Sequence, residues 1–181
     1  MIRVFNGAVA VLHHKTEEEL SKLTAIVPAG DGMGRGCAID SVQIFDTPTV
    51  TVEGEKSKRR YLVPGMALLL APYRDRQDVL VILENVHSMP KQGVASSFSF
   101  GEGKGMWEGI IAAYNLPLET PSPQRWKKEI MADQGKEKDA ARYKASQLYP
   151  NIAHLFSRVK DDGRAEALLM AEYGRRLRKA E

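Results

Sequence analysis

The choice of fold is narrowed first by five consecutive apolar residues, Val79-Leu80-Val81-Ile82-Leu83, which end abruptly at Glu84. A short apolar run rich in β-branched residues is typical of a strand that is buried on both faces. Open α/β sheets place their ligands at the carboxyl ends of such strands. Glu84 is therefore a candidate site residue, and the competing interpretation is a strand-end glutamate that only faces solvent.

Strands are expected mainly in the first half of the chain and helices in the second. Residues 7–12 form a second apolar run, and residues 41–46 and 49–52 alternate polar and apolar side chains, which predicts two antiparallel strands. A short strand is expected at 116–119, and a loop at 27–36, which carries four glycines. Helical patterns occur at 64–70, 109–114, 123–131, 136–149 and 164–178.

This order of elements predicts an α/β fold, in which helices pack on a mixed sheet. A chain of 181 residues, 43% of them hydrophobic, suits one domain spanning residues 1–181. Neither a signal peptide nor a membrane-spanning run is recognisable, so we expect a cytoplasmic protein, in a bacterial or phage-infected cell. The net charge of +3 permits a nucleic-acid partner without requiring one.

Two acidic residues, Asp162 and Glu166, are spaced four residues apart at the start of the last predicted helix. This spacing places both carboxylates on one helical face, where they can converge on a hard divalent cation. The alternative is that acidic residues near a helix N-terminus serve as caps and complement the helix dipole. Capping explains Asp161 or Asp162 better than Glu166, which lies among small and apolar neighbours that indicate packing against the sheet.

Residues 96–107 combine aromatic side chains, hydroxyl groups and glycines. Glycines allow a backbone to approach a phosphate, and aromatic rings can stack on unpaired bases. The alternative is a helix lead-in with core aromatics. Two basic clusters, at 56–60 and at Trp126-Lys127-Lys128, suit a polyanion, although solvated runs of charge are common on protein surfaces.

Three other chemistries find little support in the sequence. His13, His14 and His87 have no companions at zinc-like spacing, and the single cysteine, Cys37, lies in a different context. The chain has no Gly-x-Ser-x-Gly elbow of serine hydrolases and no phosphate loop that ends in Gly-Lys-Ser or Gly-Lys-Thr.

Four segments in fixed order, 81–90, 97–101, 123–128 and 160–169, resemble RuvC-like Holliday junction resolvases of the phage, bacterial and plant-organelle branch. The resemblance extends from about Ser41 to Gly174, and the ordered set is more specific than any single motif. It implies a ribonuclease H-like fold, a mixed sheet with helices packed on both faces, and a homodimer that cuts four-way DNA junctions. As a crossover junction endodeoxyribonuclease, the chain would use Mg2+ or Mn2+, two ions per active site.

The resemblance also implies roles for individual residues. Glu84, Asp162 and Glu166 match the acidic metal ligands, which would activate a water molecule and stabilise the leaving oxygen. The DNA contacts are expected from a larger set, namely Phe98, Phe100, Gly101, Gly103, Lys104, Trp126, Lys127, Lys128, Arg59 and Arg60.

The N-terminal segment departs from the family pattern. Family members open with a strand that carries a catalytic Asp, whereas residues 1–6 here contain no acid, and an ungapped count places Ile2 near the Asp position. Asn6 is a weaker metal ligand than a carboxylate. The alternative function is therefore a catalytically impaired protein that binds junctions, and a weaker third option is a nucleotide-binding protein of the same broad fold.

Overall fold

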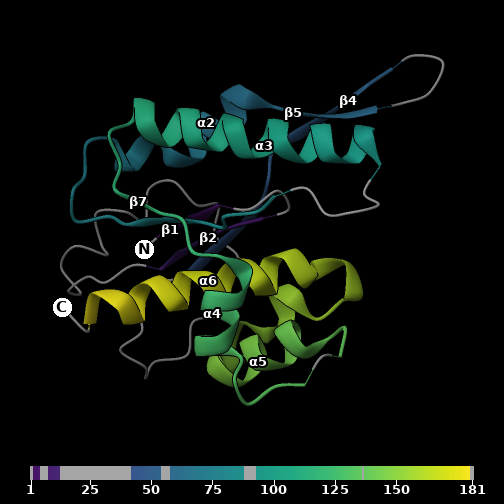
Figure 1. Ribbon diagram of the computed structural model, residues 1–181, viewed down its shortest axis with the longest axis vertical. Coiled ribbons are helices and arrows are strands. Elements are labelled where there is room, and N and C mark those ends of the chain that lie inside the picture. Colours follow the sequence, from purple (N-terminus) through teal and green to yellow (C-terminus); the bar gives the residue numbers. More distant parts are fainter. Residues whose placement is uncertain are drawn as a thin grey trace.

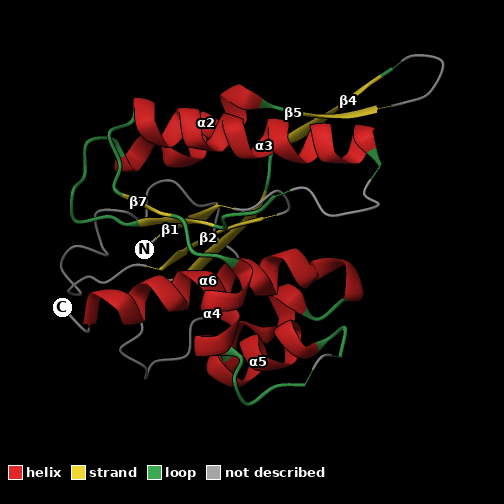
Figure 2. Ribbon diagram, viewed as in Figure 1, coloured by secondary structure: helices red, strands yellow, loops and turns green. Residues whose placement is uncertain are grey.

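The computed structural model describes residues 2–4, 8–12, 42–53, 58–87, 93–135 and 137–179. Its main sheet has five strands in the order β3 (Val42–Asp46), β2 (Ala8–Leu12), β1 (Ile2–Val4), β6 (Val81–Leu83) and β7 (Leu118–Glu119). Strands are drawn in yellow in Figure 2. The pairs β3–β2 and β2–β1 are antiparallel, whereas β1–β6 and β6–β7 are parallel. The sheet is thus mixed, which confirms the expected α/β class.

Helices cover both faces of this sheet (Figure 1). On one face lie α2 (Val63–Leu70) and α3 (Val94–Ala113); on the other lie α4 (Pro123–Ile130), α5 (Ala140–Leu148) and α6 (Asp162–Lys179). The sequence of β2 is apolar throughout because both of its faces are buried. Ala8, Ala10 and Leu12 belong to the core beside α6, and Val9 and Val11 belong to the core beside α2 and α3. Successive side chains point to opposite faces, and both faces are buried.

A two-stranded ribbon, β4 (Thr49–Val52) and β5 (Lys58–Tyr61), projects from the α2–α3 side of the molecule (Figure 1). The expected strands at 41–46 and 49–52 therefore both exist, but they belong to different sheets, since β3 pairs with β2 and β4 pairs with β5. Strands β1 and β5 were not predicted. Charged residues dominate β5, so its sequence carries little hydrophobic periodicity.

The segment 96–107 lies within the 20-residue helix α3, which confirms the helical alternative for this segment. The buried residues Gly103, Trp107, Ile110 and Ile111 follow helical spacing and face the sheet. This apolar face offsets the low helix propensity of the glycines, so tertiary packing decides the local structure.

Three short 3-10 segments, η2 (Ala71–Tyr73), η3 (Pro150–Phe156) and η4 (Val159–Asp161), complete the described elements. None of the described helices is long and apolar enough to cross a membrane. The glycine-rich segment 27–36, together with His13, His14 and Cys37, falls outside the described residues.

The strand register brings several chain segments to one end of the main sheet. Val4 pairs with Leu83 in parallel and with Val9 in the antiparallel direction, and Ala8 pairs with Asp46. The carboxyl ends of β1, β6 and β3 and the start of β2 therefore share this end. Glu84 follows β6 there, as predicted.

Candidate active site

Glu84 is buried at the end of β6, with 8% of its surface exposed. Its Oε1 accepts a hydrogen bond from the indole Nε1 of Trp126, at 2.7 Å. Trp126 comes from α4 and is itself fully buried. Because a buried carboxylate requires a polar partner, this contact keeps Glu84 inside the protein rather than facing solvent.

Glu166, on α6, contacts Lys127, the residue that follows Trp126 on α4. The Nζ of Lys127 lies 3.4 Å from Glu166 Oε1, and it lies 5.3 Å from the centre of the Trp126 ring. The Glu166 side chain is 26% exposed, so it lies at the boundary between core and solvent. Two acidic residues that are 82 positions apart in the sequence thus contact adjacent residues of α4.

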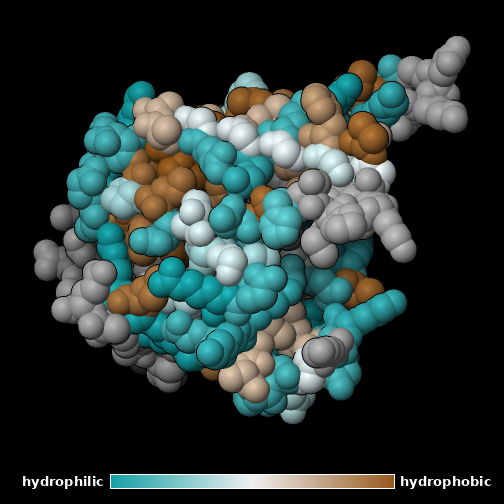
Figure 3. All heavy atoms as spheres, in the orientation of Figure 1, coloured by the Kyte–Doolittle hydropathy of each residue, from teal (hydrophilic) through white to brown (hydrophobic). Residues whose placement is uncertain are grey.

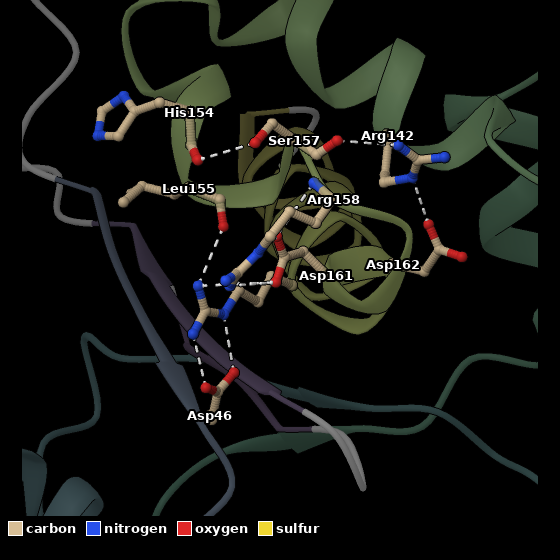
Figure 4. Close-up of polar contacts among 9 residues, drawn as sticks. Asp46, Arg142, His154, Leu155, Ser157, Arg158, Asp161 and Asp162 are labelled. Atoms are coloured by element: carbon tan, nitrogen blue, oxygen red, sulfur yellow. Dashed lines mark hydrogen bonds and ion pairs between the residues drawn. The ribbon is translucent and has the colours of Figure 1, made fainter.

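Asp162 lies at the start of α6 and contacts a different helix. Its Oδ1 accepts a hydrogen bond from Arg142 Nε at 2.6 Å, and Arg142 belongs to α5 (Figure 4). The spacing of Asp162 and Glu166 does place them on one face of α6, but they pair with cations from two separate helices.

The donor chemistry of the three carboxylates suits a hard divalent cation, and positive groups of the protein already lie against two of them. Within the part of the chain that the structure describes, however, no three acidic, histidine or cysteine side chains are gathered as a metal-binding group. The site in this conformation holds its acids in separate pairs.

Arg164, near the start of α6, is bound to the end of β3 and to η3. Arg164 donates to both carboxylate oxygens of Asp46, at 2.8 and 2.6 Å, and to the carbonyl oxygen of Leu155, at 3.1 Å (Figure 4). The hydrogen bonds from Arg164 lower the pKa of the Asp46 carboxyl below its ordinary value, although partial burial opposes the shift. Since Asp46 ends β3, this contact ties α6 to the same end of the sheet that carries Glu84.

Asp161, the residue before α6, is buried and closes the turn of η4. Its carboxylate accepts hydrogen bonds from the main-chain N–H of Arg158, at 3.1 Å, and from the Arg158 guanidinium, at 2.8 and 2.9 Å. These bonds, the side-chain ones above all, lower the pKa of Asp161 to about 2. The residue therefore has a structural role beside the three candidate ligands.

Replacing Asp161 by asparagine is expected to lower the Tm at pH 7 by about 2–4 °C, because the ion pair with Arg158 is lost. The decrease is small because the Arg158 side chain is exposed and solvent screens the pair. The folded-state pKa lies below the ordinary value of 3.8, so the contribution is complete above about pH 4 and is lost as the pH falls towards 2. Melting curves from pH 2.5 to 7 should therefore converge for the two proteins at the acidic end. A difference in Tm that stays constant with pH would contradict this account.

The predicted DNA contacts of α4 divide by exposure. Trp126 is fully buried, which leaves no ring surface for a base to stack on, and its role is to hold Glu84. Lys127 and Lys128 are exposed, and hydrophilic residues dominate the surface over α4 in Figure 3. Lys128 is therefore accessible to a phosphate backbone, whereas Lys127 pairs with Glu166.

The other predicted contacts lie on the opposite side of the sheet. Phe98 on α3 is 70% exposed, Gly101 is exposed, Phe100 is half-buried, and Gly103 is buried, which removes it from any direct contact. Lys104 pairs with Glu108 at 3.0 Å. Arg59 and Arg60 are exposed on β5, and Arg60 lies 3.9 Å from Glu102 of α3.

Sequence reasoning missed two residues that shape the site, Asp46 and Arg142. Asp46 ends a predicted strand as Glu84 does, so the argument used for Glu84 could have identified it. Arg142 lies within a helix whose sequence shows no motif, and only the packing of α5 against α6 reveals its contact with Asp162.

No protein-family model matches the chain. The chain is similar to the chloroplastic Holliday junction resolvase MOC1 of Chlamydomonas reinhardtii, with 26% identity over 158 residues. The aligned part covers 81% of this chain but 18% of that protein. Most of this chain is thus similar to a short part of a protein that is named as a junction resolvase.

Proposed function

We propose that this chain is a structure-selective endonuclease that resolves four-way DNA junctions by metal-dependent hydrolysis of phosphodiesters. The observation that carries the proposal is the meeting of Glu84, from the sheet, and Glu166, from the last helix, at adjacent residues of α4. The similarity to the algal resolvase supports the choice of substrate. The strand order and the helices on both faces support the ribonuclease H-like assignment.

In this proposal, Glu84, Glu166 and Asp162 hold Mg2+ or Mn2+, since carboxylate oxygens are the ligands that these ions prefer. When bound, such ions generate a nucleophile from water and neutralise charge on the leaving oxygen. Trp126 fixes the direction of the Glu84 carboxylate through its hydrogen bond. Lys127 and Lys128 position the DNA backbone beside the acids, because each carries an exposed positive charge on the same helix.

Symmetric cuts in a four-way junction require two active sites, so we also propose a homodimer. Multi-angle light scattering of the purified protein, alone and with junction DNA, tests this part separately. A mass of one chain under both conditions would contradict it.

The central experiment incubates the protein with a mobile four-way junction and Mg2+ or Mn2+. Paired nicks in opposite strands are expected, and a chelator should abolish them. Linear duplex of the same sequence serves as the control substrate and should remain uncut. Equal cutting of junction and duplex would argue for a general nuclease, and the absence of any cutting would favour the second candidate.

The second candidate is a protein that binds junctions without cutting them, and one observation favours it. The end of β1 lies beside the end of β6, since Val4 pairs with Leu83, yet residues 1–6 contain no acid. The register places Ile2, the position that the ungapped count gives for the missing Asp, opposite Val81 and three residues before Glu84. Four-way junctions should then be bound far more tightly than linear duplex, and neither Mg2+ nor Mn2+ should support cutting.

Lys128→Ala is expected to weaken junction binding and to reduce the slope of log affinity against log salt by about 1, because one phosphate contact fewer releases one counterion fewer. Fluorescence anisotropy at several salt concentrations measures this slope. Lys144→Ala is the matched control, since Asp133 already neutralises Lys144 at 2.6 Å, and it should leave the slope unchanged. Equal slopes for Lys128→Ala and the unmodified protein would place Lys128 away from DNA.

A further inference from the structure

The two acids of α6 are each held by one cation, and each cation comes from a different helix. Arg142 of α5 lies 2.6 Å from Asp162, and Lys127 of α4 lies 3.4 Å from Glu166. Asp162 and Glu166 occupy the same face of α6, one helical turn apart. Without these cations, two negative charges would repel each other on that face. With them, Asp162 is attracted towards α5 and Glu166 towards α4.

The two cations are not equally free to move. The Arg142 side chain is 18% exposed and also donates to the main-chain oxygen of Ser157, at 3.2 Å, so it is anchored at two points. The Lys127 side chain is 47% exposed, and its ammonium group has one carboxylate and the face of the Trp126 ring as neighbours. Arg142 is thus a fixed holder of Asp162, whereas Lys127 can leave Glu166 at small cost.

We infer that Arg142 and Lys127 are built-in counter-ions of the acidic site, which compete with divalent cations for Asp162 and Glu166. They are positioning residues, because they act through the carboxylates. The inference rests on the proposed function, and it explains why the described acids are held in pairs instead of gathering into one metal-binding group.

The competition follows from charge and geometry. A carboxylate oxygen that accepts a hydrogen bond from Arg142 at 2.6 Å has less electron density to offer a cation, and the positive charge beside it repels a second one. Cation binding therefore has to loosen these pairs. Lys127, once released from Glu166, becomes available to a phosphate, so DNA and metal should each favour the binding of the other.

The test measures Mn2+ binding to the full chain without DNA, by isothermal titration calorimetry. Lys127→Ala is expected to raise Mn2+ affinity about threefold and Arg142→Ala about tenfold, because the second pair is shorter and its cation is less exposed. The charge-conserving variants Lys127→Arg and Arg142→Lys should stay within about twofold of the unmodified protein. Lys144→Ala, which removes a positive charge from α5 that pairs with Asp133 at 2.6 Å, is the matched control and should also leave the affinity within about twofold.

Unchanged or weaker Mn2+ binding in both alanine variants would overturn the inference. Arg142→Ala could loosen the contact between α5 and α6, and melting curves of that variant would reveal this. Lys127→Ala is expected to fold in either case, because the Lys127 side chain is half exposed. Glu166→Gln separates this result from a failure of the proposed function. If the unmodified protein binds Mn2+ and Glu166→Gln does not, the cation site exists and only the role of the counter-ions is in question. If neither protein binds Mn2+, both proposals fail.

Discussion

Glu84→Gln is expected to reduce metal-dependent cutting of four-way junctions by about 100-fold or more, while junction affinity stays within about threefold. Glutamine has the shape of glutamate, and its side-chain oxygen can still accept the hydrogen bond from Trp126. The fold is therefore retained, and what is lost is the negative charge that a divalent cation needs. Single-turnover cleavage with Mg2+ and anisotropy without metal measure the two properties separately.

Glu129→Gln is the matched control for this result, because Glu129 is an exposed acid on α4. It should leave both cutting and binding unchanged. Parallel loss of cutting and junction affinity in Glu84→Gln would indicate that Glu84 supports the fold of the binding surface, and retention of full cutting would remove it from the active site.

Trp126→Ala is expected to lower the free energy of unfolding by about 3–5 kcal/mol, since it deletes a fully buried aromatic side chain from the core between α4, α6 and the sheet. The loss of its indole N–H also leaves the buried Glu84 carboxylate without this partner, which adds about 1–3 kcal/mol. Losses of this size are a large share of the stability of an ordinary domain. Urea denaturation at pH 7 measures them.

Trp126→Phe separates the two contributions, because phenylalanine fills most of the same space and cannot donate the hydrogen bond. Its expected cost is about 1–3 kcal/mol. Lys127→Ala, one residue further along α4, should change stability by less than about 1 kcal/mol, as its side chain is half exposed. A cost below 1 kcal/mol for Trp126→Ala would show that α4 does not depend on this anchor.

The position of Glu84 could be predicted from the sequence because its cause is local. Five apolar residues specify a strand that is buried on both faces, and the first charged residue after them must lie at its end. The helical spacing of Asp162 and Glu166 is equally local and agrees with α6. The partners of these acids could not be predicted. Arg142 and Lys127 reach α6 only because α4 and α5 pack against it, and this packing depends on the whole core.

Residues 96–107 form a segment whose structure could not be predicted from local propensity. Their glycines favour a loop by propensity, whereas the burial of Trp107 and Ile111 against the sheet produces a continuous helix. Trp126 shows a similar effect, because an aromatic residue next to two lysines is a reasonable candidate for base stacking, yet its ring is in the core. The sequence therefore suggests which side chains could contact DNA, and burial in the structure excludes some of them.

The order of the elements along the chain has a consequence for folding during synthesis. Strand β2 is apolar on both faces, but the helix that covers one of those faces, α6, begins about 150 residues later in the chain. During synthesis, the side chains of Ala8, Ala10 and Leu12 therefore stay uncovered until α6 has been made. Their contacts with α6 have a large sequence separation, which slows folding. A chain that stops before residue 162 would expose this face and would also lack two of the three acids. A product that ends between β2 and α6 would thus be prone to aggregate and could not hold the complete set of acids.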